Sequence, residues 1–196
     1  MRSSKIYPFL ALLIEFGPLL LFIIMSWYFP FMLAVEGLVT STILSLIASR
    51  LIQKRLALFP LIAGLTIIIM GLITIYTENN LFIITRDTLF NGSLALIIFY
   101  SLYNNNLILK NLFENTFAIN DKGWKIVSIN WAFWLLLLAT SNQIIGSFYP
   151  LDFWIIFKTC SFGFSILFCL FQFVIAHKEK LPESNFLGLR KKALKR

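Results

Sequence analysis

The chain has 196 residues, of which 59% are hydrophobic and 13% charged, and its mean hydropathy is +0.82. Since about a quarter of the residues of an average soluble domain are charged, these values exclude a soluble globular domain and predict an all-α, polytopic bundle of transmembrane helices. The net charge of +8 would fit a nucleic-acid partner. The basic residues, however, lie in loops and a tail beside apolar segments, where anionic lipid headgroups are the nearer partner.

Six apolar segments are long enough to cross a bilayer, which takes about 20 residues of α-helix. We expect spans at about 9–28, 31–49, 57–76, 84–103, 126–145 and 153–176. In the third span, Gly64 and Gly71 share one face and predict the close approach of another helix. Short loops leave no room for a soluble domain. We therefore predict one membrane domain, residues 1–178, and a basic, flexible cytoplasmic tail, residues 179–196.

The basic residues are sorted to one side of these spans. Fifteen of the seventeen Lys and Arg residues lie at the amino terminus, in the loops 50–55 and 110–125, or in the tail from Lys178 onward. The exceptions are Arg86 and Lys158. Because loops rich in Lys and Arg resist translocation, both termini are predicted to be cytoplasmic, with 50–55 an inner loop and anionic lipids beside the inner loops and the tail.

The loop between the fourth and fifth spans contains a short amphipathic pattern. Apolar residues recur there at helical spacing, with polar residues on the other side: Leu109, Leu112, Phe113 and Phe117 against Lys110, Asn111, Glu114 and Asn115. The pattern predicts a short amphipathic helix that either lies on the inner membrane surface or packs on the ends of the spans. The stretch Asn120-Asp-Lys-Gly123 is predicted to end it as a turn.

Charged and amide side chains within the spans are the candidate functional residues, because such groups are costly in a membrane. By depth, one set is expected near the outer side: Glu36, Arg86, Asp87, Asn142 and Lys158. A second set is expected near the inner side: Glu15, Asn130 and Gln172. The four outer charges sum to zero, as mutual pairing in a low dielectric requires. The outer set therefore predicts either a polar, ligand-binding cavity or pairs that lock helix packing.

Enzyme chemistry finds little support in the sequence. The single histidine, His177, lies at the inner end of the last span, and no His or Cys residues occur at metal-ligand spacing. Phosphate-binding loops, dinucleotide fingerprints and nucleophile elbows are not present in the sequence. We therefore expect no catalytic residue, no cofactor and no metal.

Several short stretches, in order and over nearly the whole chain to about Lys178, resemble the intracellular septation protein A family of bacterial inner-membrane proteins. They are Glu15-Phe-Gly-Pro-Leu19, Pro60-Leu-Ile-Ala-Gly64, Asp121-Lys-Gly-Trp124, Trp131-Ala132 and Asp152-Phe-Trp-Ile-Ile-Phe-Lys158. The sequence departs from the family pattern at Met70-Gly71, where the family tends to have two glycines. It also departs at Ile84-Thr85 and Asn130, where the family tends to have basic residues.

The resemblance implies a non-enzymatic inner-membrane protein that takes part in cell division, septum formation and envelope maintenance. It implies contacts with membrane proteins of division or wall synthesis, and often five spans, whereas the charge pattern favours six. Self-association into a homo-oligomer is a further expectation. The residues leave open a second hypothesis, in which the protein is a transporter or channel and uses the outer polar set to bind a small solute or lipid. A membrane anchor whose basic tail recruits anionic lipid is a third hypothesis.

Overall fold

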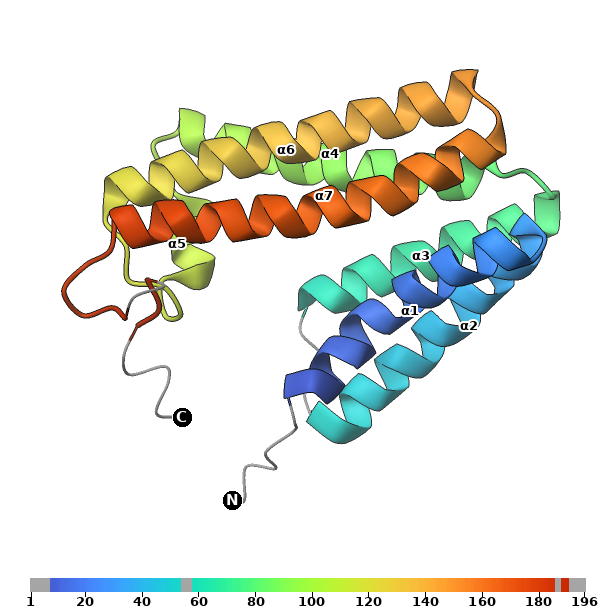
Figure 1. Ribbon diagram of the computed structural model, residues 1–196, viewed down its shortest axis with the longest axis horizontal. Coiled ribbons are helices and arrows are strands. Elements are labelled where there is room, and N and C mark those ends of the chain that lie inside the picture. Colours follow the sequence, from blue (N-terminus) through green and yellow to red (C-terminus); the bar gives the residue numbers. More distant parts are fainter. Residues whose placement is uncertain (1–7, 54–57, 186–187, 191–196) are drawn as a thin grey trace. The chain divides into compact units, whose positions relative to one another are not determined.

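The computed structural model describes residues 8–53, 58–185 and 188–190, with only the backbone for 8–13, 15, 52–53 and 58–60. This part of the chain contains seven α-helices and one π-helical turn (Figure 1): α1 (Pro8–Tyr28), α2 (Phe31–Ala48), η1 (Ser49–Gln53), α3 (Leu58–Thr77), α4 (Leu81–Tyr103), α5 (Ile108–Phe113), α6 (Asp121–Phe148) and α7 (Leu151–Lys178). Among these residues the only β-type pairings are isolated bridges. The predicted all-α fold is confirmed.

Each of the six predicted spans coincides with a helix. Four helical segments are long and apolar enough to cross a membrane: Phe31–Leu51, Leu81–Tyr103, Asp121–Phe148 and Leu151–Lys178. The helices α1 and α3 have 21 and 20 residues. Within them the apolar stretches Phe16–Tyr28 and Leu61–Thr77 are shorter. Helices suit the hydrocarbon interior of a membrane, where no water is present, because every backbone polar group inside a helix is hydrogen-bonded within the same segment.

Several hydroxyl side chains within these helices donate to a backbone carbonyl of their own helix. The Ser26 hydroxyl donates to the Phe22 carbonyl at 2.8 Å, and the Thr74 hydroxyl donates to the Met70 carbonyl at the same distance. The Thr140 hydroxyl donates to the Leu136 carbonyl at 2.9 Å. Such bonds to the carbonyl four residues earlier remove the cost of an unpaired hydroxyl, so serine and threonine are tolerated in these apolar segments.

Proline and asparagine set the helix boundaries. Pro30 and Pro150 precede α2 and α7, where the missing backbone N–H of proline does not interrupt a helix. The Pro150 carbonyl accepts hydrogen bonds from Phe153 and Trp154 at 3.0 and 3.2 Å. Before α4, Glu78 has a positive φ of 51°, and the Asn79 side chain accepts the Leu81 N–H at 3.0 Å. This local hydrogen bond turns the chain into α4.

Three loop predictions need correction. The predicted inner loop from Arg50 is helical as far as Gln53, because η1 continues α2. The predicted amphipathic helix exists, but it ends at Phe113, and Phe117 instead forms a β-bridge with Leu189. The predicted turn at Asn120–Gly123 is the start of α6. The Asn120 side chain accepts the Gly123 N–H at 2.7 Å, which is the hydrogen bond of a helix N-cap.

The described chain forms two compact units. The first contains residues 8–53, 58–87 and 142–158, and the second contains residues 88–141, 159–185 and 188–190. The first unit holds α1, α2 and α3 side by side (Figure 1). Its buried core is Phe22, Ala34, Val35, Leu38, Ile83, Ile84, Trp154 and Ile155.

The predicted close approach at Gly64 and Gly71 is confirmed within the first unit. A Cβ atom at Gly64 would lie 3.0 Å from a methyl carbon of Leu46 on α2. At Gly71 a Cβ atom would collide with the Val39 side chain, also on α2. These glycines therefore let α2 and α3 pack at short range.

In the second unit the segment after α7 packs on the loop before α6. The N–H groups of Ala118 and Asn120 donate to the carbonyls of Gly188 and Glu179 at 2.8 and 3.0 Å. The Leu181 N–H donates to the Ala118 carbonyl at 2.9 Å. A small core of Ile119, Trp124, Val127 and Ala176 lies beside these bonds. The predicted boundary at 178 thus does not separate the described part of the tail from the fold, and residues 191–196 lie outside the described residues.

Candidate functional site

Asp87 on α4 lies at the centre of a buried ionic group in the first unit. Its carboxylate accepts hydrogen bonds from Arg86 Nη1 at 2.6 Å and from Lys158 Nζ on α7. The three side chains are between 12% and 20% exposed. In such a low-dielectric site a carboxylate is stable only when it is paired and hydrogen-bonded. The predicted association of Arg86, Asp87 and Lys158 is therefore present in the structure.

Arg86 extends this group to α3. Its Nη2 donates to the Ala63 carbonyl at 3.0 Å, and its Nε donates to the Thr66 hydroxyl at 3.3 Å. A guanidinium group has five donors in a fixed plane, so it can bind a carboxylate and a neighbouring helix at the same time. The ionic group consequently links α3, α4 and α7.

Asn142 on α6 makes a second polar link. Its side-chain N–H group donates to the Ile84 carbonyl on α4 at 2.8 Å, and its side-chain oxygen accepts Trp154 Nε1 at 3.0 Å. Asn142 is 3% exposed and Trp154 is 1% exposed. Both ends of the amide are therefore used, as burial requires, and α4, α6 and α7 are held together.

Trp154 joins the two links. Lys158 Nζ lies 5.9 Å from the centroid of the Trp154 ring, one helical turn away on α7. The same ring packs edge-on against Phe22 and Phe31, at centroid distances of 6.3 and 5.9 Å. We call the set Thr66, Arg86, Asp87, Asn142, Trp154 and Lys158 the buried polar network.

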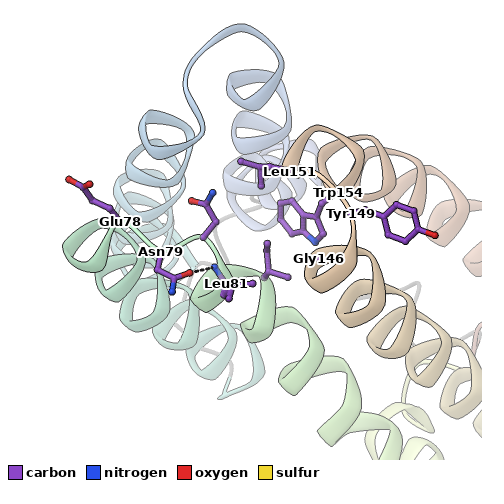
Figure 2. A pocket seen from close by; sticks show the side chains of 9 residues that line it. Glu78, Asn79, Leu81, Gly146, Tyr149, Leu151 and Trp154 are labelled. Carbon is purple, nitrogen blue, oxygen red and sulfur yellow. Dashed lines mark hydrogen bonds between the residues drawn. The ribbon is translucent and has the colours of Figure 1, made fainter.

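A cavity of about 490 Å³ adjoins this network in the first unit. Its lining comes from the turn before α4, the start of α4, the end of α6, the turn before α7 and the start of α7. Figure 2 shows Trp154 and Leu151 of α7 near Leu81, with the Asn79 side chain bonded to the Leu81 backbone. Trp154 therefore belongs to the buried polar network and also lines the cavity.

The remaining predicted residues are not part of the network. Glu36 is exposed on α2 and takes part in none of the ion pairs among the described side chains. The predicted neutral group of four charges is therefore wrong at Glu36, and the paired group carries one acid and two bases. In the second unit, the Asn130 side chain points a donor at the Gln172 side-chain oxygen at 3.5 Å, a long contact. The Glu15 side chain lies outside the described residues.

Sequence reasoning missed two members of the network, Thr66 and Trp154. Thr66 looks like an ordinary polar residue in an apolar span, and its role depends on the long reach of Arg86. Trp154 gave a signal, since it lies four residues before Lys158 in the stretch that carries the family resemblance. Residues four apart on a helix share a face, which would have placed the indole beside the lysine.

A second polar group lies outside the spans, in the second unit. The Glu179 carboxylate accepts a hydrogen bond from the Asn120 side chain at 2.8 Å and pairs with Lys122 at 3.2 Å. These two contacts, with the Asn120 hydrogen bond the larger cause, lower the pKa of Glu179 below its ordinary value. Lys110 pairs with Asp121 at 2.6 Å, and this hydrogen bond raises the pKa of Lys110.

Comparison with known proteins identifies the family of this chain. The profile of the family described as intracellular septation protein A matches residues 10–183. The chain belongs to this family. Named relatives from several bacteria agree with this assignment over nearly the full length, and no solved structure matches the chain.

The family members most similar in sequence include two proteins named inner membrane-spanning protein YciB. The one from Rhizobium meliloti (strain 1021) is 27% identical over 93% of this chain and 95% of its own length. The one from Sinorhizobium fredii (strain NBRC 101917 / NGR234) is 28% identical over 89% and 91%. With the long apolar helices, these matches identify a multi-pass protein of the bacterial inner membrane. Neither family name describes an enzymatic activity.

Proposed function

We propose that this member of the intracellular septation protein A family is a non-enzymatic component of the division and envelope apparatus. It acts through contacts with membrane proteins of division or wall synthesis, and copies of the chain can also contact one another. The observation that carries the proposal is that the buried polar network uses its charges and amides to fasten four helices to each other.

The network supports a structural role because its groups bind one another and the helix backbones. Asp87 has two cationic partners, and Asn142 bonds to both a carbonyl and an indole. A buried amide or charge satisfied in this way fixes the packing of helices. Fixed helix packing of this kind suits a protein that functions by binding other proteins through its surface.

The helix surfaces support the same proposal. On α7, Phe164, Leu167 and Phe171 are 59%, 61% and 56% exposed. Their spacing places them on one face of the helix. In a bilayer such a face contacts lipid or the apolar face of a partner helix, and it is the surface through which protein contacts would form.

We further propose six spans with both termini in the cytoplasm. The first unit brings the turns 78–80 and 149–151 to one cavity, and it packs Phe22 and Phe31, on either side of the α1–α2 turn, against Trp154. The second unit brings the loop before α6 against the segment after α7. Each grouping joins loops that the six-span arrangement assigns to the same side.

Photo-crosslinking in living cells tests the role in division. A photoreactive amino acid is placed at Phe164, Leu167 or Phe171 on α7, and at Leu89 or Leu96 on α4 as a second exposed face. We expect adducts with division or wall-synthesis proteins from one face and fewer from the other. Adducts with lipid alone from every position would argue against the proposal, and adducts between copies would identify the homo-oligomeric face.

Single-cysteine labelling tests the spans, in a chain whose Cys160 and Cys169 are replaced by serine. Cysteines at Glu78 and Tyr149 should react with a membrane-impermeant maleimide added to the periplasmic side. Cysteines at Asn115 and Glu183 should react only after the membrane is opened. If the cysteines at positions 78 and 149 reacted from opposite sides of the membrane, the six-span arrangement would be wrong.

A transporter or channel is the second candidate, and the cavity beside Trp154 is the observation that favours it. The two functions differ in how they depend on charge. A scaffold retains its cellular phenotype when Lys158→Met and Asp87→Asn are combined and the variant still folds with Arg86 as the remaining charge, because a scaffold does not use these charges to bind a solute. A transporter loses function in the same folded double variant, so this variant separates the candidates.

A further inference from the structure

A cavity of about 580 Å³ lies in the second unit, where α4 ends, α5 follows and α6 begins. Its lining contains three lysines, three asparagines, one aspartate and two leucines. Its volume lies within the range of small-molecule sites, about 300–1,000 Å³. The buried polar network and the proposed function make no use of it.

The charge of the lining is positive. Three lysines, Lys110, Lys122 and Lys125, stand against the single carboxylate of Asp121, which leaves +2. Lys110 pairs with Asp121, and Lys122 pairs with Glu179, which is not part of the lining. Asp121 and Lys122 are each 76% exposed. Because exposed ion pairs contribute little to stability, an incoming anion can replace the carboxylate partner of Lys110 or Lys122 at a small cost in free energy.

The asparagines of the lining are held in place by a fixed turn. Asn105 has a positive φ of 52°, and the Asn106 N–H donates to the Ser101 carbonyl at 2.9 Å. The Asn111 side chain donates to the Asn106 side chain at 3.0 Å. The Ser101 hydroxyl also accepts the Ile108 N–H at 3.0 Å. The cavity wall is therefore formed before any ligand binds.

The first turn of α6 supplies another part of the wall through Asp121 and Lys122. Gly123 brings this turn close to Glu179, since a Cβ atom at Gly123 would lie 2.7 Å from the Glu179 Cβ. The amino terminus of a long helix carries partial positive charge, which favours an anion nearby. The Asp-Lys-Gly-Trp stretch of the family resemblance thus forms one side of a basic cavity.

The depth of the cavity points to a lipid headgroup. The 28 residues of α6 extend about 42 Å at 1.5 Å per residue, whereas the hydrocarbon core is about 30 Å thick. The polar first turn therefore lies at the level of the headgroups. Leu102 and Leu107 give the same cavity an apolar edge, which suits the glycerol and acyl part of a phospholipid.

We propose that this cavity binds the phosphate group of an anionic phospholipid. Lys110, Lys122 and Lys125 are the cationic contacts, and the asparagine side chains of the α4–α5 turn are hydrogen-bond partners. Lysine is a common ligand of phosphate, and amide groups donate to its oxygens. The chemistry recognised is an anionic phosphate ester, and a comparison of phosphatidylglycerol with glycerol 1-phosphate distinguishes a lipid source from a soluble one.

Native mass spectrometry of the detergent-purified full-length chain tests the proposal. Dioleoyl phosphatidylglycerol should bind more tightly than dioleoyl phosphatidylcholine. Lys125→Gln should weaken phosphatidylglycerol binding about fivefold, since each basic residue near anionic lipid contributes about that factor. Lys125→Arg should stay within about twofold of the wild type, because the charge is kept. Lys178→Gln removes an equal charge from another exposed residue, and it should change binding less than about twofold.

Three results would overturn the proposal. Equal binding of the two lipids would show that the site does not select an anionic headgroup. Equal weakening by Lys125→Gln and Lys178→Gln would reduce the effect to diffuse attraction by the basic surface. Binding of glycerol 1-phosphate as tight as that of phosphatidylglycerol, with the same dependence on Lys125, would assign the cavity to a soluble phosphate ester. An unchanged melting temperature of Lys125→Gln shows that the variant is folded.

Discussion

The two units hold their charged side chains in opposite ways. In the first unit, Arg86, Asp87 and Lys158 are mostly shielded and bind one another. In the second unit, Asp121 and Lys122 are largely exposed although each belongs to an ion pair. A buried charge must be fully paired to be tolerated, whereas an exposed charge can exchange its partner for water or a ligand. Similar residue types therefore stabilise the fold in one unit and are available for binding in the other.

The largest expected effect comes from Asp87→Asn. The change leaves Arg86 and Lys158 without the carboxylate between them, and breaking a buried ion pair destabilises a protein by about 3–5 kcal/mol. Asp121→Asn is the matched control, because Asp121 pairs with Lys110 at the surface and should contribute less than about 1 kcal/mol. Unfolding of both variants in mixed detergent micelles measures the difference. Equal losses of stability would remove the contrast between the units.

Asn142→Leu should have the next largest effect. It leaves the Ile84 carbonyl and Trp154 Nε1 without their hydrogen-bond partner, at a cost of about 1–3 kcal/mol. Gln143→Leu is the neighbouring control, because its side chain bonds to Ser147 on the same helix at 3.0 Å. The control should change stability by about 0.5 kcal/mol or less. Combination with Trp154→Phe should give less than the sum of the two single effects, and full additivity would show that the residues are not coupled.

Asn120→Ala measures how much a polar contact of the second unit contributes to stability, for comparison with the variants of the first unit. It removes the N-cap of α6 and the hydrogen bond to Glu179, and loss of an N-cap costs about 1 kcal/mol. Asn104→Ala, at an exposed position after α4, should be close to neutral. The melting temperature should fall for the first variant alone. A loss as large as that of Asp87→Asn would mean that the partly buried contacts of Asn120 support the fold as strongly as the buried ion pairs of the first unit.

The smallest expected effect is a dependence on pH. The pKa of Glu179 is lowered in the folded chain from its ordinary value of 4.5, by the Asn120 hydrogen bond and by Lys122. A lowered folded pKa means that the unfolded chain binds the proton more readily as the pH falls. The contribution is therefore present above the ordinary value and disappears as the pH falls through the folded pKa. The melting-temperature difference between the wild type and Glu179→Gln should shrink in acid, and a difference that grows would contradict the assignment.

The sequence could predict how deep a residue lies along its membrane span, but it could not predict which face of the helix the residue occupies. The depth of a residue in the membrane is predicted from its place along an apolar segment, so Arg86, Asp87, Asn142 and Lys158 were expected in one group. The structure places these four in the same buried polar network. The face of a helix does not follow from depth, because no strong amphipathic pattern marks the inside of a bundle in lipid. For this reason Glu36, at a similar predicted depth, was placed in the cluster although it is exposed on α2.

The contacts of residues 179–185 and 188–190 could not be predicted for another reason. They are mostly hydrogen bonds between backbone groups, with Ala118 and Asn120 facing Gly188 and Glu179. Backbone groups are the same for nearly every residue type, so these pairings leave little trace in composition. The basic character of the tail was visible in the sequence, and its attachment to the loop before α6 was not.

That attachment bears on how the protein is engineered. Lys178 looks from the sequence like the natural place to cut the chain or to join a reporter. A cut there would remove the backbone acceptors that Glu179 and Gly188 offer to Asn120 and Ala118, and also the Glu179 carboxylate beside Asn120. A fusion that begins after Arg190 keeps all of these partners. Truncations intended to test the role of the basic tail should therefore retain residues 179–190 and vary only residues 191–196.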